Sequence, residues 1–78
     1  MDAPQIITDP NILLGKPVIA GTRISVELIL EKLGAGETID DLLLDYPFLT
    51  RDQVLTAIRF AAQSLKNEVV YPFPGQVA

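Results

Sequence analysis

The stretch from residue 49 to residue 66 constrains the fold most, because it combines a helix-start signal with an unbroken helical repeat. Thr50 can cap the first turn, and Gln53 stands three residues later, as in a capping box. Leu49 and Val54 have the spacing of a hydrophobic staple across the same start. We therefore predict a helix over residues 51–66. Its predicted inward face consists of Val54, Leu55, Ile58, Ala61 and Leu65.

Two shorter amphipathic helices are predicted before it. The first begins after Ser25, a good N-cap, and ends at the glycines of positions 34 and 36. Ile24 and Ile29 have the spacing of a second hydrophobic staple across its start. The second begins after Thr38 and stops at Tyr46, because the following proline disfavours helical angles there. Their predicted apolar faces are Val26, Ile29, Leu30 and Leu33 in the first, and Ile39, Leu42, Leu43 and Tyr46 in the second. A tight turn over residues 47–49 then suits a helix-turn-helix.

The first quarter of the chain is predicted to be a hairpin. Ile6-Ile7 and Val18-Ile19 are short β-branched runs, and the residues between them include the turn formers Asp9-Pro10-Asn11 and Gly15-Lys16-Pro17. The predicted fold class is therefore mainly α, a three-helix helix-turn-helix bundle with a short N-terminal β-hairpin. It forms a single domain over 1–78, divided into a hairpin arm (1–24), a helical core (25–66) and an extended tail (67–78).

Composition restricts the chemistry that such a domain can perform. The 78 residues include no cysteine and no histidine, which removes the usual thiolate nucleophile and the commonest general base and metal ligand. We expect no enzyme activity, no cofactor and no metal. The net charge of −4 disfavours strong non-specific binding to nucleic acid. Neither a signal peptide nor a membrane-spanning apolar run is recognised, so a soluble cytoplasmic protein is expected.

One string of residues resembles a known family. The run Gly15-Lys16-Pro17-Val18-Ile19-Ala20-Gly21-Thr22-Arg23-Ile24, followed by Tyr46-Pro47-Phe48-Leu49-Thr50 and Ala57-Ile58-Arg59-Phe60-Ala61, is similar to the domain of unknown function 433 family. The resemblance covers roughly residues 6–66 and marks Gly15, Lys16, Pro17, Gly21, Thr22 and Arg23 as a signature. It implies a homeodomain-like three-helix fold with a hairpin. It also implies pairing with a PIN-like nuclease, with this chain as the antitoxin-like half of a toxin–antitoxin pair.

A polar stripe on the last helix is the candidate DNA-reading face. In a homeodomain-like fold this helix presents side chains to the major groove, and Arg and Gln can bond bases bidentately. The stripe can equally be the solvated face that every amphipathic helix has, and Asp52 within it would repel phosphate. The candidate contacts are Arg51, Thr56, Arg59, Gln63 and Lys66.

The signature and the acids have alternative interpretations. Gly15-Lys16 fails the phosphate-loop pattern, because proline follows the lysine and no helix opens there. Arg23 either contacts a phosphate or carboxylate, or pairs with Glu27 or a neighbouring carbonyl. The acids Asp40, Asp41 and Asp45 could form a metal-binding cluster, but acids in a first turn, as Asp40 and Asp41 are, are ordinary at a helix N-terminus, and this interpretation is preferred.

Two functions from different classes remain. The first is an antitoxin-like partner of a PIN-like nuclease that can also bind DNA as a transcriptional autoregulator. The second is a small oligomerisation or protein-interaction module with no nucleic-acid role.

In the tail, Tyr71 and Phe73 are candidate partner-binding residues. A two-fold homodimer is expected from apolar residues that lie off the predicted core faces, namely Ile12, Leu13, Leu14, Leu44 and Phe60.

Overall fold

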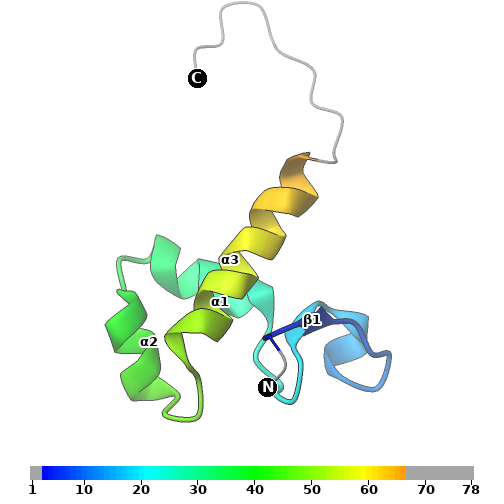
Figure 1. The fold of residues 1–78 in the computed structure, drawn as a ribbon, viewed down its shortest axis with the longest axis horizontal. Helices are drawn as coiled ribbons and strands as arrows, with labels where there is room; N and C mark the ends of the chain where they lie inside the picture. The colour runs from blue at the N-terminus through cyan, green and yellow to red at the C-terminus, as the bar shows by residue number, and fades with distance from the viewer. Residues whose placement is uncertain (1–2, 67–78) are drawn as a thin grey trace, which may run out of the picture.

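The computed structural model describes residues 3–66 (Figure 1). These form β1 (Ile6–Ile7), a 3-10 turn η1 (Leu13–Gly15), β2 (Val18–Ile19), α1 (Val26–Gly34), α2 (Ile39–Asp45) and α3 (Arg51–Lys66). The predicted fold class, mainly α with three helices and a short N-terminal hairpin, is confirmed.

The hairpin is a two-stranded antiparallel sheet that joins the helical core. Ile6 pairs with Ile19 and Ile7 with Val18, and an isolated bridge links Val18 to Ser25. Both residues of β2 are fully buried, whereas β1 lies at the edge, against α3. The hairpin therefore covers one side of the bundle and brings the N-terminal residues next to α3.

Local caps set where each helix begins. The Leu28 N–H donates to Ser25 Oγ at the start of α1. At the start of α2, Thr38 and Asp41 form a capping box: the Asp41 N–H donates to Thr38 Oγ1 and the Thr38 N–H to Asp41 Oδ2. All three predicted helix starts agree with the observed ones, because capping depends on residues within a single turn.

The core lies where the three helices and β2 meet. Its centre is formed by Ile19, Ile29, Leu42 and Val54, each almost completely buried. Ile24 and Leu49, which precede the caps of α1 and α3, are also buried in this cluster, as the two predicted staples require. The remaining buried members are Val26 and Ala57.

The inward face predicted for α3 is only partly correct. Val54 is buried, and Ile58 and Ala61 pack against the core, but Leu55 and Leu65 are exposed. The C-terminal part of α3 rises away from the other elements in Figure 1, so within residues 3–66 no other element packs over Leu65. Among the residues expected to be exposed, Leu13, Leu14 and Leu44 are exposed, whereas Ile12 is half-buried and Phe60 packs against the core.

A small cluster ties the end of α1 to the end of α2. The Lys32 ammonium lies 3.5 Å from Glu37 Oε2 and 3.8 Å from Asp45 Oδ2, and 5.8 Å from the centre of the Tyr46 ring. Glu37 is the largest cause that raises the pKa of Lys32. These contacts orient α2, the first helix of the helix-turn-helix.

No helix within residues 3–66 combines the length and the apolar character that crossing a membrane requires.

Candidate functional site

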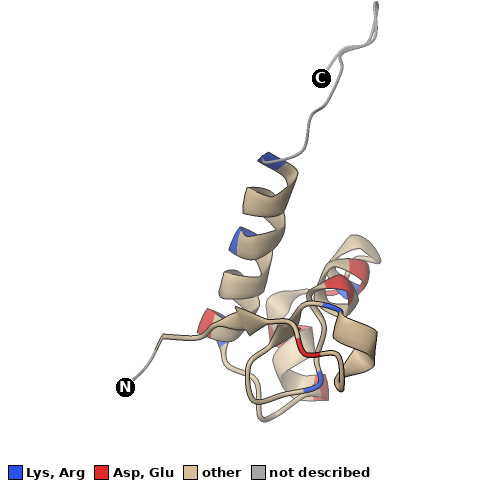
Figure 2. Ribbon diagram, turned by 90° about the vertical axis from the view of Figure 1, so that its right-hand side faces the viewer, with Lys and Arg blue, Asp and Glu red and all other residues tan. Residues whose placement is uncertain are grey.

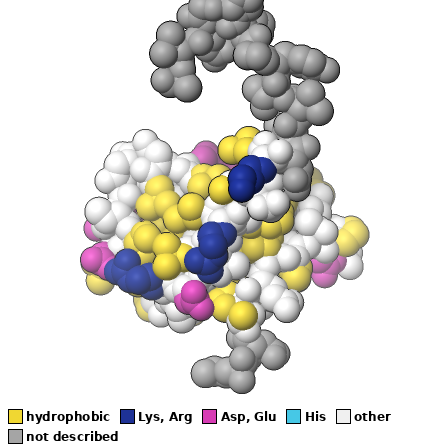
Figure 3. Space-filling view, turned by 45° about the horizontal axis from the view of Figure 1, so that its top comes forward, with side chains coloured by type: hydrophobic (Ala, Val, Ile, Leu, Met, Phe, Trp, Pro, Cys, Tyr) yellow, Lys and Arg dark blue, Asp and Glu magenta, His cyan; other side chains and the backbone are white. Residues whose placement is uncertain are grey.

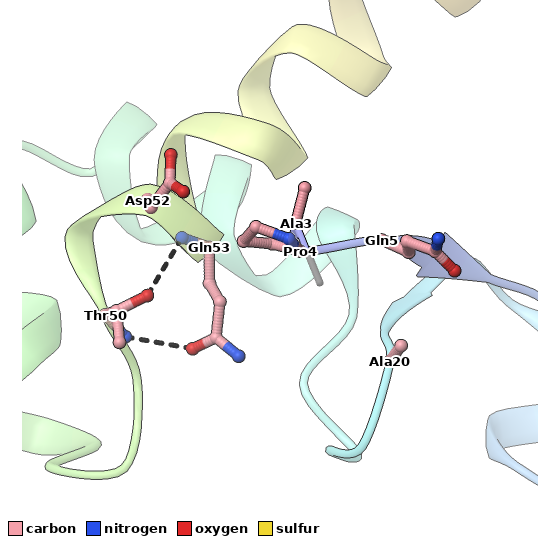
Figure 4. A pocket seen from close by; sticks show the side chains of 7 residues that line it. All are labelled: Ala3, Pro4, Gln5, Ala20, Thr50, Asp52 and Gln53. Atoms are coloured by element: carbon pink, nitrogen blue, oxygen red, sulfur yellow. Dashed lines mark hydrogen bonds between the residues drawn. The ribbon is translucent and has the colours of Figure 1, made fainter. Parts of the chain in front are cut away.

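The start of α3 is fixed by a capping box and lies beside the N-terminal segment. The Gln53 N–H donates to Thr50 Oγ1 at 3.1 Å, and the Thr50 N–H donates to Gln53 Oε1 at 2.9 Å. Figure 4 shows this capping box beside the N-terminal segment, where Pro4 lies close to the Gln53 side chain and Asp52 points away from it. Residues from both segments line one shallow hollow. The first turn of α3 is therefore held by its cap and flanked by the N-terminus.

The polar stripe of α3 lies along the side of the helix opposite the buried Val54 and Ala57, as helical periodicity requires. Figure 2 shows basic positions spaced along this helix, with an acidic position near its start. Of the candidate contacts, Arg51, Arg59, Gln63 and Lys66 are exposed and Thr56 is half-buried.

Acidic side chains neutralise part of this stripe. Arg51 donates through Nη2 to Asp40 of α2, and Arg59 Nη2 lies 3.8 Å from Asp52 Oδ1. Arg59 also donates to Thr56 Oγ1 at 3.2 Å. The ion pairs are exposed and therefore weak, but they reduce the positive potential that attracts phosphate. On the face shown in Figure 3, the basic side chains stand apart between hydrophobic ones and do not merge into one positive surface.

The N-terminal segment covers one flank of the stripe. A hollow between this segment and α3 is lined by Pro4, Gln5, Ile6, Thr56, Arg59, Phe60 and Gln63. Thr56 is half-buried in this hollow, whereas Arg59 and Gln63 border it and stay exposed. Sequence reasoning missed this flank, although a phenylalanine on the otherwise polar side of the helix was a signal that another element covers it. The part of the stripe that remains open consists of Arg51, Arg59, Gln63 and Lys66.

Three of the six signature residues, Gly21, Thr22 and Arg23, lie in the turn between β2 and α1, and the other three precede β2. Gly21 has φ +83°, a left-handed conformation that glycine adopts without strain. Thr22 Oγ1 donates to the Ile19 carbonyl at 2.8 Å and accepts from the Ile24 N–H at 3.0 Å. The Pro17 carbonyl accepts from the Val26 N–H. These contacts give Thr22 and Pro17 structural roles in joining the hairpin to the first helix.

The structural interpretation of Arg23 had its side chain pair with Glu27 or bond a neighbouring carbonyl, and it does not pair with Glu27. Glu27 Oε1 instead lies 2.7 Å from the Lys16 ammonium, and this contact raises the pKa of Lys16. Arg23 is exposed, and within residues 3–66 no carboxylate lies within ion-pairing distance of it. The contact of Arg23 with an external phosphate or carboxylate remains a prediction.

Next to Arg23, the chain presents two leucines on a strained turn. Leu13 and Leu14 have φ +48° and +58°, and the left-handed region costs a non-glycine residue about 1–2 kcal/mol. Leu14 is nonetheless 96% exposed, so its side chain gains almost no burial within the described chain. A shallow hollow beside this turn is lined by Leu13, Leu14, Lys16, Arg23, Ser25, Leu28 and Glu31. Neither the turn geometry nor the hollow was predicted.

The acids of α2 serve the structure. The carboxylate of Asp41 accepts the backbone N–H of Thr38, which lowers the pKa of Asp41. Asp40 pairs with Arg51, and Asp45 lies near Lys32. In the part of the chain that the structure describes, no group of three or more potential ligands gathers as a metal site would require.

The comparison with protein families identifies the chain. A family described as protein of unknown function (DUF433) matches residues 6–61, from β1 through most of α3. The chain belongs to this family. The matched range contains the strained turn and the residues from Gly15 to Arg23 that carried the resemblance. No curated protein and no solved structure matches the chain. The two tail candidates, Tyr71 and Phe73, lie outside the described residues.

Proposed function

We propose that this DUF433 domain is a non-catalytic binding protein, the antitoxin-like partner of a PIN-like nuclease. The observation that carries the binding role is the exposure of large apolar side chains on a small domain. Leu14, Leu44, Phe48 and Leu65 are 96%, 78%, 60% and 64% exposed. Large apolar side chains left exposed on a domain of this size are candidate contact positions for a partner.

The chemistry of the chain supports binding over catalysis. With no histidine and no cysteine, its candidate acid–base groups are carboxylates, amines and the phenols of two tyrosines. The acids Asp40, Asp41 and Asp45 are engaged in capping or in ion pairs with basic side chains. Such carboxylates stabilise the helices and are not gathered around a common reacting centre.

The nuclease as partner rests on the family resemblance, and a co-purification experiment tests it. We expect a PIN-like nuclease gene next to the gene of this chain. Co-expression with a tag on the nuclease should retain the untagged chain in a complex of fixed stoichiometry. A chain with serine at the exposed positions Leu44 and Phe48 tests whether the α2 side contributes, and circular dichroism checks its fold. If the wild-type chain washes off the tagged nuclease at low salt, the nuclease is not its partner.

DNA binding through α3 is the second candidate, supported by the helix-turn-helix arrangement and by Arg51, Arg59 and Lys66 on its open side. Because Arg51 and Arg59 are paired with acids, binding by this chain alone should be weak and salt-sensitive. Replacing both arginines by alanine should abolish binding at low salt while the fold persists.

The DNA experiment has a control with the same change in charge. Lys16→Ala and Arg59→Ala each remove one positive charge, but Lys16 lies on the hairpin side, paired with Glu27. The wild type and the variants would be titrated with DNA from upstream of the gene at two salt concentrations. Equal losses for Lys16→Ala and Arg59→Ala would mean that net charge, not α3, governs binding. If the wild type does not bind DNA, either alone or together with the nuclease, the DNA-binding role fails. The alternative is then a protein-interaction module without a nucleic-acid role.

A further inference from the structure

We propose that the surface around Arg23 is where two copies of this chain meet, in a dimer with two-fold symmetry. The central residues of this surface are Leu13, Leu14, Arg23 and Glu31, and we call it the Arg23 face. The proposal goes beyond nuclease binding and does not depend on it.

Apolar side chains lie on both sides of Arg23. On one side, Leu13 and Leu14 border a hollow that also contains the half-buried Leu28. On the other side, Arg23 borders a second hollow together with Ile12 and Phe48. The strained turn holds Leu14 out into solvent, where a second surface can cover it. A dimer contact at this position would bury apolar surface that the described part of the chain leaves exposed.

The charges on the Arg23 face are self-complementary. Arg23 and Glu31 border the same hollow, and within residues 3–66 neither lies within ion-pairing distance of an opposite charge. The other cation of the hollow, Lys16, is paired with Glu27. A two-fold interface brings the same patch of both subunits together, so each patch must complement itself. A second copy can place its Glu31 opposite Arg23 and its Arg23 opposite Glu31, with the leucines between the two pairs.

This balance favours a second copy over other occupants. A nucleic acid would meet Arg23 favourably, but the carboxylate of Glu31 would repel its phosphates. A purely acidic or purely basic partner segment would leave one of the two charges without its complement. A second copy satisfies both charges at once and covers the leucines.

Sedimentation velocity over a concentration series tests the apolar part. We expect a monomer–dimer equilibrium for the wild type. Leu14→Ser should raise the dimer dissociation constant by roughly 100-fold, since one leucine is lost from each side of the interface. Leu44→Ser is the matched control, because Leu44 is also an exposed leucine but lies on α2. A wild type that is monomeric throughout, or a dimer that Leu14→Ser leaves unchanged, overturns the proposal.

Charge reversal tests the symmetry itself. Arg23→Glu places two carboxylates opposite each other at both pairs of its homodimer, and Glu31→Arg places two cations there. Each single variant should therefore dissociate. A mixture of the two variants should form a heterodimer, because the glutamate at position 23 of one meets the arginine at position 31 of the other, and the native Glu31 meets the native Arg23.

The mixture also controls for folding, because a misfolded variant cannot be rescued by mixing. Dissociation of each variant alone together with recovery in the mixture supports the proposed interface. Single variants that dimerise as well as the wild type, or a mixture that stays monomeric, would overturn it. Retention of the chain by the tagged nuclease is a separate readout, so failure of the dimer and failure of nuclease binding are distinguishable.

Discussion

Replacing Thr50 with alanine is expected to destabilise the domain by weakening the start of α3. The Thr50 hydroxyl accepts the Gln53 N–H at 3.1 Å, one of the N–H groups in the first turn that have no partner within the helix. Alanine keeps the backbone but leaves this N–H to water. Thr50 is exposed, so the loss is that of a cap without a core cavity, about 1 kcal/mol.

The size of this effect makes it measurable. A domain of 78 residues has a free energy of unfolding of about 4–12 kcal/mol, so a loss near 1 kcal/mol is a substantial fraction. The thermal midpoint should fall by about 4–8 °C. In a urea titration followed by circular dichroism, the midpoint should fall while the slope stays constant, because unfolding exposes the same surface.

Two further variants show which atoms are responsible. Thr50→Ser keeps the hydroxyl and should retain most of the stability. Gln53→Ala removes the reciprocal bond from the Thr50 N–H, so the effects of Thr50→Ala and Gln53→Ala should not be additive in the double variant. An unchanged midpoint for Thr50→Ala would show that this cap does not hold the helix. A loss for Thr50→Ser equal to that for Thr50→Ala would show that the hydroxyl is not responsible.

Three other changes test the core, a turn and a titrating cap. Leu42→Ala, at a fully buried position, should cost about 2–5 kcal/mol in a urea titration, whereas a loss below about 1 kcal/mol would contradict the assigned core. Gly21→Ala should cost about 1–2 kcal/mol because φ is +83°, although a Cβ there would meet nothing within 4 Å, so an unchanged stability would contradict the turn. Asp41 has a pKa below its ordinary value of 3.8, so its carboxylate stabilises the fold above that pH and loses this contribution as pH falls through the folded-state pKa. The difference in unfolding free energy between wild type and Asp41→Asn should therefore shrink below pH 3.8, and a pH-independent difference would contradict the assignment.

The sequence predicted what depends on neighbouring residues. Helix starts at Ser25, Thr38 and Thr50 were predictable because each capping hydroxyl and the N–H that donates to it lie within one turn. The hairpin was predictable from two β-branched runs separated by turn formers, and the two staples from residue spacing. These features follow from local chemistry alone.

What the sequence did not predict depends on contacts between distant residues or on strain. Lys16 pairs with Glu27, and Arg51 with Asp40, across eleven positions, which no periodicity indicates. The left-handed angles at Leu14 oppose the preference of leucine, so propensity predicts another conformation. Phe60 was expected to be exposed because it lies off the predicted core face of its helix. It packs against the core, and the tertiary fold brings the N-terminal segment to its side of α3, which the local sequence does not indicate.

The most direct test of the proposed function is a titration of nuclease activity. The purified chain would be added stepwise to the PIN-like nuclease encoded beside it, with a nucleic-acid substrate that the nuclease cleaves. An antitoxin-like partner should reduce cleavage in proportion to the amount added, and cleavage should stop at a fixed ratio of chain to nuclease. A heat-unfolded sample of the chain serves as the control. Cleavage that continues unchanged with the folded chain in large excess would contradict the account.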